Sequence, residues 1–246
     1  MAGMNAPDAR ERPPSDCPVC DAGPARPFLT VDSLGYWRCP ACLATFLDAA
    51  HFPDARAERA RYLLHNNDPQ DPGYRNFLNR LARPLLEKLA PARQGLDYGC
   101  GPGAPALAQI LAEAGHSIRL YDPFFHPDAS ALEQTYDFIA CTEAVEHFHH
   151  PSREFARLDA LLRPGGWLGV MTRFLTDDTR FAGWHYRRDE THVVFYRPET
   201  FRRIAARFGW QCEIPADNVV LMRKSISSGA SEEKHGDARS APAVRD

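Results

Sequence analysis

The stretch LDYGCGPGAPALAQIL, residues 96–111, decides the fold of this chain. An apolar, strand-forming segment runs into a glycine-rich turn, and a helix-forming segment follows the turn. Such a turn can cradle a nucleotide-like ligand with its backbone N–H groups at the helix N-terminus. Gly99, Gly101 and Ala104 match the dinucleotide pattern G-x-G-x-x-G/A, whereas Gly99, Gly101 and Gly103 match the G-x-G-x-G turn that binds S-adenosylmethionine. The turn alone leaves both ligands open.

Strand and helix patterns alternate downstream of this turn. We expect strands near 96–98, 116–121, 136–142 and 167–172, helices over 105–114, 152–162 and 199–208, and two short closing strands. This alternation predicts an α/β fold with a doubly wound, mostly parallel, Rossmann-like sheet, which binds ligands at the carboxyl ends of its strands. Only thirteen residues separate Asp122 from Tyr136, so the edge strand expected there is short or missing.

Composition divides the chain into five segments. Residues 1–15 and 225–246 are polar and lack apolar periodicity, which predicts disorder. Residues 16–46 form a cysteine-rich module, 47–92 a helical linker or cap, and 93–224 the α/β domain. Within the cap, Tyr62, His65 and Tyr74 are candidates to fold over a bound cofactor.

The bulk numbers describe an ordinary globular protein. At 246 residues, the chain can form one α/β domain and a small appendage. A net charge of −3 gives no global attraction to nucleic acid or to an anionic membrane. The apolar runs are too short to span a membrane and the N-terminus lacks the apolar core of a secretory signal. We therefore expect a cytoplasmic protein.

Four cysteines crowd the first fifth of the chain. Cys17 and Cys20 form one C-P-x-C knuckle, and Cys39 and Cys42 form another after 18 intervening residues. This spacing predicts a tetrahedral structural Zn²⁺ site, in which metal binding contributes roughly 10–16 kcal/mol in small peptides. Redox pairs, a mononuclear iron site or unligated thiols are the alternatives. Residues 15–50, which include the module, carry two arginines against four aspartates, so this part of the chain does not favour nucleic acid.

Two residues around the glycine turn bear on the choice of cofactor. Asp97 lies two positions before Gly99, and Pro102 removes one N–H donor, so both weaken a cradle for pyrophosphate. A carboxylate at the strand end instead suits the ammonium and sulfonium charges of S-adenosylmethionine. Asp122, at the end of the next strand, can accept both ribose hydroxyls, but this suits NAD equally well.

Three segments in the same order decide between these ligands: LDYGCGPG, YDFIACTEAVEHFHHP and LLRPGGWLGVMT. Together they resemble the class I S-adenosylmethionine-dependent methyltransferases over about residues 95–172, here with an N-terminal four-cysteine, zinc-ribbon-like module. The resemblance implies that Asp97, Gly99 and Gly101 hold the amino-acid end of the cofactor, that Asp122 holds the ribose, and that Thr142 and Glu143 border the methyl group. Pro123 and Phe124 are candidates for the adenine contacts that the family takes from the missing strand. The cofactor-binding residues are therefore expected to be Asp97, Tyr98, Gly99, Cys100, Gly101, Asp122, Pro123, Thr142 and Glu143.

The insertion at residues 173–196 is the predicted acceptor pocket. Its aromatic side chains would cover an apolar or planar acceptor, and His185 or His192 could act as a general base near neutral pH. Glu143, the third candidate catalytic residue, shares a helical face with Glu146 and His147, where an internal ion pair is the simpler interpretation. The aromatic residues of the insertion are Phe174, Phe181, Trp184, Tyr186, Phe195 and Tyr196.

The sequence thus predicts an enzyme that methylates O, N or C of a small, aromatic or apolar molecule. One alternative is a tRNA or rRNA methyltransferase that grips its substrate with the zinc module, supported by eleven arginines against seven acids in residues 153–207. Another is a non-enzymatic module that retains the fold. The acceptor, the methylated atom and the oligomeric state stay open.

Overall fold

The computed structural model describes residues 16–64, 67–103 and 105–226. The predicted disorder at 1–15 and over most of 225–246, the cap residue His65 and the turn residue Ala104 lie outside these ranges. Within them, no helix is long and apolar enough to cross a bilayer.

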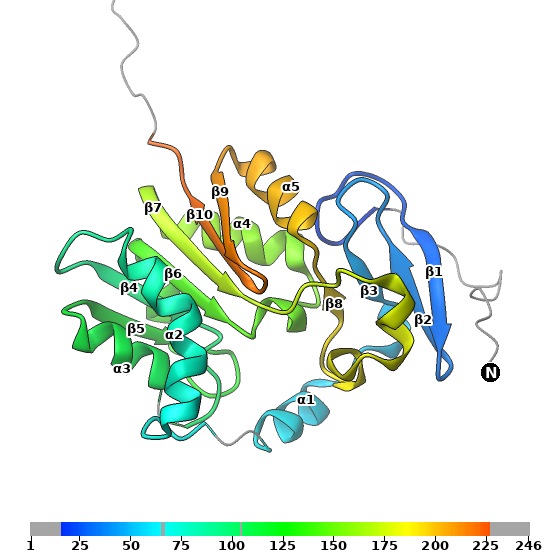
Figure 1. Ribbon diagram of the computed structural model, residues 1–246, viewed down its shortest axis with the longest axis horizontal. Coiled ribbons are helices and arrows are strands. Elements are labelled where there is room, and N and C mark those ends of the chain that lie inside the picture. Colours follow the sequence, from blue (N-terminus) through cyan, green and yellow to red (C-terminus); the bar gives the residue numbers. More distant parts are fainter. Residues whose placement is uncertain (1–15, 65–66, 104, 227–246) are drawn as a thin grey trace, which may run out of the picture.

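The centre of the molecule is a six-stranded sheet with the order β5-β4-β6-β7-β10-β9 (Figure 1). The first four strands run parallel, whereas β10 is antiparallel to both of its neighbours. This arrangement confirms the doubly wound, mostly parallel sheet. In the described chain β5 is the edge strand, so the predicted loss of the next strand is also confirmed. The strands are β4 Gln94–Tyr98, β5 Ser117–Tyr121, β6 Tyr136–Thr142, β7 Leu162–Met171, β9 Gln211–Ala216 and β10 Val219–Arg223.

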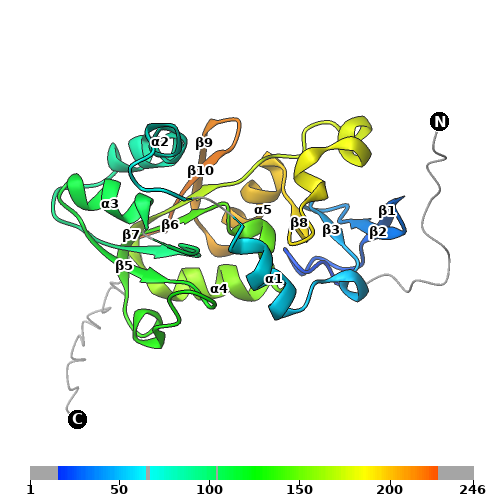
Figure 2. The same ribbon diagram turned by 90° about the horizontal axis from the view of Figure 1, so that it is seen from below.

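Helices cover both faces of this sheet (Figure 2). Helices α2 Pro72–Leu86 and α3 Ala106–Glu113 bury leucines against one face, on Phe138 and Met171. Helices α4 Pro151–Leu161 and α5 Pro198–Phe208 cover the other face. Successive residues of a strand point to opposite faces of the sheet. The apolar strands β6 and β7 therefore contribute side chains to the core on each face.

A short helix, α1 Ala55–Tyr62, precedes α2 and lies near the carboxyl ends of the parallel strands. The Asp54 side chain accepts a hydrogen bond from the Ala57 N–H and caps the first turn. The Asp71 side chain caps α2 in the same way, and Pro72 occupies the first turn, where it costs no hydrogen bond. The predicted cap therefore consists of two helices, each with a side-chain cap.

The cysteine-rich segment forms a second sheet with the order β1-β2-β3-β8. Its strands are β1 Arg26–Val31, β2 Leu34–Arg38, β3 Thr45–Leu47 and β8 Val194–Phe195. The sequence division placed residues 194–195 in the α/β domain, whereas the structure pairs them with β3 of the cysteine module. The core of the module is also continuous with the α4–α5 side of the large sheet. The two parts are therefore joined by shared strands and by one apolar core.

The cysteine module packs against two 3-10 helical segments of the insertion, Asp178–Gly183 and His185–Arg188. Phe181 packs edge-on against Tyr36, with 4.9 Å between ring centroids. Arg38 forms a bidentate ion pair with Asp178, including an Nη2–Oδ1 distance of 2.7 Å. The aromatic insertion therefore packs against the cysteine module.

Candidate active site

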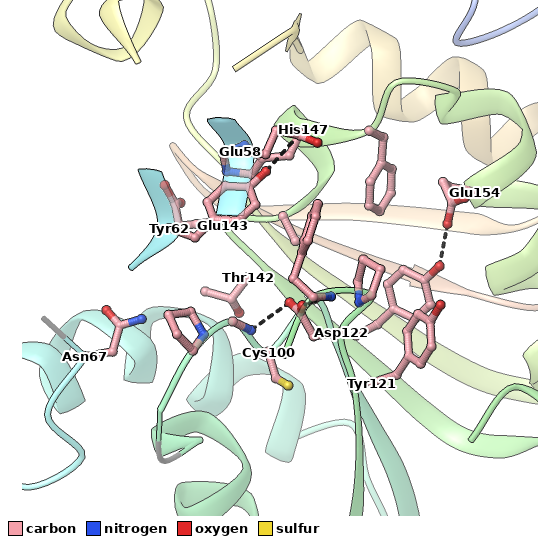
Figure 3. Close-up of a pocket in the computed structure, with 18 of the residues that line it drawn as sticks. Glu58, Tyr62, Asn67, Cys100, Tyr121, Asp122, Thr142, Glu143, His147 and Glu154 are labelled. Atoms are coloured by element: carbon pink, nitrogen blue, oxygen red, sulfur yellow. Dashed lines mark hydrogen bonds between the residues drawn. The ribbon is translucent and has the colours of Figure 1, made fainter. Parts of the chain in front are cut away.

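A cavity of about 560 Å³ lies at the carboxyl ends of β4, β5 and β6. This is the edge at which parallel α/β sheets bind their ligands. Figure 3 shows Asp122 between two ends of the cavity, with Tyr121 and Glu154 on one side and Glu143 and His147 on the other.

The glycine turn forms the wall between these ends. Gly99, Gly101 and Gly103 all adopt positive φ, at +77°, +70° and +85°. A Cβ atom on Gly99 would also stand 2.6 Å from the Cβ of Ala144, so this position excludes any side chain. The Asp122 carboxylate accepts N–H bonds from Gly101 at 3.0 Å and from Phe124 at 2.8 Å. The second strand end thus fixes the shape of the glycine turn.

Asp97 lies beneath the turn rather than on the cavity wall. It is 3% exposed and is absent from the cavity lining. Burial, and then the charge of Asp122, raises the pKa of Asp97 to about 7. A cation bound above the turn would favour its ionised form.

The other predicted cofactor residues all reach the cavity. Thr142 and Glu143 end β6, and Glu143 has a positive φ of 47°, which tilts the chain away from the sheet. Burial raises the pKa of the Glu143 carboxyl to about 7. Those lining the cavity are Tyr98, Gly99, Cys100, Gly101, Asp122, Pro123, Thr142 and Glu143, together with Phe124.

The end near Glu154 is formed by the carboxyl ends of β4 and β5 and by the first turns of α4. Tyr98 and Tyr121 lie there with ring centroids 5.2 Å apart. The Tyr98 hydroxyl donates to Glu154, and Arg157 donates to the Tyr98 oxygen at 3.1 Å. Sequence reasoning named only Tyr98 of these four residues, because α4 gives no local sign that its first turns face a cavity.

The opposite end is closed by α1. Its Tyr62 packs edge-on against His147, with centroids 5.1 Å apart, and donates to Glu58 at 3.2 Å. Arg61 bridges to Asp189 of the insertion at 2.9 Å. Tyr62 and Tyr74 both line the cavity, as the sequence predicts for a cap.

The two histidines of the insertion are separated by the structure. His192 is 9% exposed and lines the cavity, and its Nδ1–H donates to the Tyr186 carbonyl at 2.7 Å. His185 is exposed and does not line the cavity. Of the two histidines, only His192 is placed to contact a molecule in the cavity.

The aromatic side chains of the insertion do not cover the cavity. All but the half-buried Trp184 are buried, and none of them lines it. The expectation of an acceptor pocket built from them is wrong, because the cysteine module competes for the same apolar surface. The corrected residues are Phe174, Phe181, Trp184, Tyr186, Phe195 and Tyr196. Aromatic walls come instead from Tyr62, Tyr74, Phe77, Phe124 and Phe148.

A buried carboxylate cluster lies behind His192. The Tyr186 hydroxyl donates to Oε1 of Glu146, stands 3.3 Å from Oε2 of Glu143, and stands 3.0 Å from Oγ1 of Thr172. Burial raises the pKa of Glu146 to about 7, with the Glu143 charge as the next cause. The partner of Glu146 in this cluster is thus Tyr186, 40 residues away, which sequence spacing did not reveal.

The four cysteines predicted to hold metal converge at the base of the small sheet. Cys17 and Cys42 have their sulfurs 3.7 Å apart, as do Cys20 and Cys39. Zn–S bonds of ~2.3 Å in a tetrahedron require sulfur–sulfur distances of about 3.8 Å. Three of the cysteines are fully buried and Cys20 is 8% exposed. The donor set and its geometry therefore fit a closed zinc site.

A glycine loop at the carboxyl ends of parallel strands defines the class: an α/β protein that binds a nucleoside-containing ligand. The family model described as "Methyltransferase domain" matches residues 71–213, which is more than half of the chain. The protein therefore belongs to this methyltransferase family.

Similar proteins include the ubiquinone biosynthesis O-methyltransferase of Bordetella avium, which is 30% identical over 122 residues, 39% of this chain and 50% of that protein. The chain thus spans about half the length of this curated relative. Among solved structures, the 1,6-didemethyltoxoflavin-N1-methyltransferase of Burkholderia thailandensis, with bound 1,6-didemethyltoxoflavin and S-adenosylhomocysteine, is 19% identical. That match covers 82% of this chain and all of the other, with a TM-score of 0.48. The magnesium protoporphyrin IX methyltransferase of Synechocystis PCC 6803 is 16% identical over 72% of this chain and 97% of the other, with a TM-score of 0.46.

Proposed function

We propose that this protein transfers a methyl group from S-adenosylmethionine to a small-molecule acceptor. The observation that carries the proposal is the charge of the cavity. Its lining contains several carboxylates and, among the described residues, a single arginine, Arg157. Pyrophosphate would be repelled here, whereas a sulfonium and an ammonium group would be attracted. The lining carboxylates are Glu58, Asp122, Glu143, Glu154 and Asp189.

The cofactor would lie across the glycine turn. The backbone at Gly99 and Gly101 would receive its amino-acid end, with Asp97 supplying negative charge from below. Asp122, already bonded to the turn, would direct its remaining lone pairs to the ribose hydroxyls. The adenine would enter the end of the cavity between Tyr121, Pro123 and Phe148.

Methyl transfer is an in-line displacement at carbon. A lone pair of the acceptor atom forms the new bond while the carbon–sulfur bond breaks, and its electron pair stays on sulfur. For a hydroxyl acceptor, a proton must also leave the oxygen, and His192 and Glu143 are the groups at that end which can receive it. Alignment of the reactants in a space shielded by α1 supplies most of the rate.

The acceptor would occupy the end of the cavity below α1. Tyr62, Phe124 and His147 form its walls and offer ring faces and edges to a planar molecule. The relative from Bordetella avium carries the name of a ubiquinone biosynthesis O-methyltransferase, which agrees with an oxygen atom as the acceptor.

The four cysteines would hold a structural Zn²⁺. With four thiolates the coordination sphere is closed, so the metal supplies stability and no chemistry. The sheet that it stabilises includes β8, two residues beyond His192. Thiols that must stay reduced for this purpose fit the cytoplasmic address expected from the sequence.

The arginine excess in residues 153–207 gives little support to an RNA substrate. Arg187 pairs with Asp32 at 3.0 Å and Arg207 pairs with Asp21 at 2.8 Å, so aspartates of the cysteine module offset part of it. Arg163 and Arg197 are paired within the large domain.

Thermal unfolding with S-adenosylmethionine, S-adenosylhomocysteine or NAD at equal concentration tests the proposal. A ligand that binds only the folded chain adds about 2.7 kcal/mol at a hundredfold excess over its dissociation constant. We expect the two sulfur ligands to raise the melting temperature and NAD to leave it unchanged. A shift with NAD alone would assign redox chemistry, and no shift with any ligand would favour a non-enzymatic module.

A further inference from the structure

We propose that Glu146, His147 and His192 bind a divalent cation at the acceptor end of the cavity. The cation would hold the acceptor oxygen beside the methyl group, and the hydroxyl proton would pass to Glu143, because Nε2 of His192 would be bound to the cation. The site itself stands on its own geometry, whereas its role toward an acceptor rests on the proposed methyl transfer.

The three side chains come from two segments that the fold brings together. Glu146 and His147 belong to the 3-10 turn Val145–His147 after β6, and His192 belongs to the insertion. One potential ligand atom from each residue lies within 4.8 Å of the other two. The Val193 N–H donates to the Glu146 carbonyl at 2.9 Å and holds the two segments in register.

Both imidazoles are oriented as metal ligands usually are. Nδ1–H of His147 donates to the Thr191 carbonyl at 2.9 Å, and Nδ1–H of His192 donates to the Tyr186 carbonyl at 2.7 Å. A carbonyl can only accept, so these bonds fix the proton on Nδ1 and place the lone pair on Nε2. A backbone carbonyl behind each imidazole is a common outer-shell partner in metal sites.

Glu146 supplies the negative charge. Its side chain is completely buried, and its Oε1 atom accepts from the Tyr186 hydroxyl. Within the described chain, its Oε2 atom is buried without a hydrogen-bond partner. A buried carboxylate oxygen without a partner is costly, and a cation between it and the two imidazoles would compensate it.

The surroundings leave one side of this group open. His147 and His192 line the cavity, whereas Glu146 stands behind them and does not. Three protein ligands with an open position facing a cavity are typical of catalytic rather than structural metal sites. Two imidazoles and one carboxylate suit Mn²⁺, Fe²⁺, Co²⁺ or Zn²⁺ better than the all-oxygen sites of Ca²⁺.

Titration with Mn²⁺ tests the site directly. The full chain, loaded with zinc at its cysteines and dialysed, is titrated while electron paramagnetic resonance measures the free Mn²⁺. Mn²⁺ prefers oxygen and nitrogen ligands, so it leaves the thiolates to zinc. We expect one Mn²⁺ per chain, and pulsed measurements should show couplings to two imidazole nitrogens in the unaltered protein.

Variants sharpen this experiment. Glu146→Gln and His192→Ala should each weaken Mn²⁺ binding by more than tenfold, since loss of even an outer-shell partner costs ~10–100-fold. His185→Ala, an exposed histidine seven residues earlier, should bind Mn²⁺ as the unaltered chain does. Affinity for S-adenosylhomocysteine, measured by calorimetry on every variant, reports whether the fold and the glycine turn are intact.

Two results would overturn the cation site. One is no Mn²⁺ binding by a chain that binds S-adenosylhomocysteine, which would leave the proposed methyl transfer standing with His192 as a proton acceptor. The other is Mn²⁺ bound without imidazole couplings, or bound equally by the Glu146→Gln and His192→Ala variants. Cation binding without any affinity for S-adenosylhomocysteine would instead keep the site and remove the methyl transfer.

Discussion

The two ends of the cavity are built in different ways. The glycine-turn end takes Gly99, Asp122 and Thr142 from three consecutive strand ends, so each residue is placed by a local motif. The acceptor end takes Tyr62, Glu146 and His192 from three distant segments that meet only in the folded chain. The first end is held by backbone geometry and the second by tertiary contacts. We therefore expect the two ends to respond differently to substitution.

The cysteine module is connected to the second end through its strand β3. The Leu47 N–H of β3 donates to the Val193 carbonyl at 2.9 Å, and the Val193 N–H donates to the Glu146 carbonyl. A short run of backbone hydrogen bonds thus leads from the sheet of the module to the backbone of Glu146 in the proposed cation site. No comparable bond joins the described part of the module to the glycine turn.

The largest effect is expected from Cys39→Ser. It removes one of four thiolates, and structural zinc supplies roughly 10–16 kcal/mol of apparent binding energy in small peptides. Zinc content should fall by one ion per chain, and the melting temperature should drop sharply. Cys212→Ser, a half-buried cysteine of β9, is the matched control. A zinc-free Cys39→Ser chain with unchanged melting would show that the module folds without metal.

The next effect is expected from His192→Ala. Loss of a positioned proton acceptor or of a cation ligand should slow turnover by ~10²–10⁴-fold. Affinity for S-adenosylhomocysteine should stay the same, because His192 belongs to the other end of the cavity. The rate is measured as release of S-adenosylhomocysteine with a phenolic acceptor found by screening. Equal turnover in His192→Ala and His185→Ala would remove His192 from the mechanism.

A smaller effect is expected from Gly99→Ala, at the opposite end. The new methyl group would meet the Cβ of Ala144 at 2.6 Å on a backbone with φ of +77°. Strain of this kind costs about 1–3 kcal/mol, and cofactor affinity should fall with it. Gly183→Ala is the control, because nothing lies within 4 Å of its added methyl group. Urea unfolding and calorimetry measure both, and similar values for the two variants would contradict the prediction.

The smallest effect is a pH dependence at Asp97. Its pKa is raised to about 7 in the ligand-free fold, above its ordinary value near 3.8, so folding takes up a proton between these values. Its contribution to stability is therefore present at low pH and is lost as the pH rises through 7. Asp97→Asn should lose this dependence. In urea unfolding, its stability relative to the unaltered chain should be greater at pH 8 than at pH 5.

Ligand binding should show the opposite sign at the same residue. The ammonium group of S-adenosylhomocysteine favours ionised Asp97. As the pH is raised towards 7, the affinity of the unaltered chain should therefore increase, by at most about tenfold per pH unit. Calorimetry from pH 5.5 to pH 8 compares it with Asp97→Asn. Parallel profiles for the two proteins would mean that Asp97 does not sense the ligand.

The difference between the two ends also explains what could be predicted from the sequence. The places of Asp122 and Thr142 at the cavity could be predicted, because strand ends and glycine turns carry local patterns. The sequence does not predict the positions of Glu58 and Tyr186 or the neighbours of His192. These depend on which surface of the molecule the cysteine module covers. The prediction for the aromatic insertion is wrong for the same reason. Its apolar side chains are buried as expected, but they pack against the cysteine module and do not line the acceptor pocket. The composition of a segment indicates how much apolar surface it will bury, but not which part of the molecule that surface will pack against.

The pairing of β8 with β3 has a consequence for the order in which the protein is made. The four cysteines leave the ribosome early, so the proposed zinc ion could bind while only the first part of the chain has been made. The last strand of their sheet emerges roughly 150 residues later, which at ~5–20 residues per second is about 7–30 s of synthesis. Until then β3 exposes an unpaired edge, and the acceptor end does not yet exist. The strand ends around the glycine turn and the first turn of α4, by contrast, are all translated before the insertion, so the proposed cofactor end can form before the acceptor end.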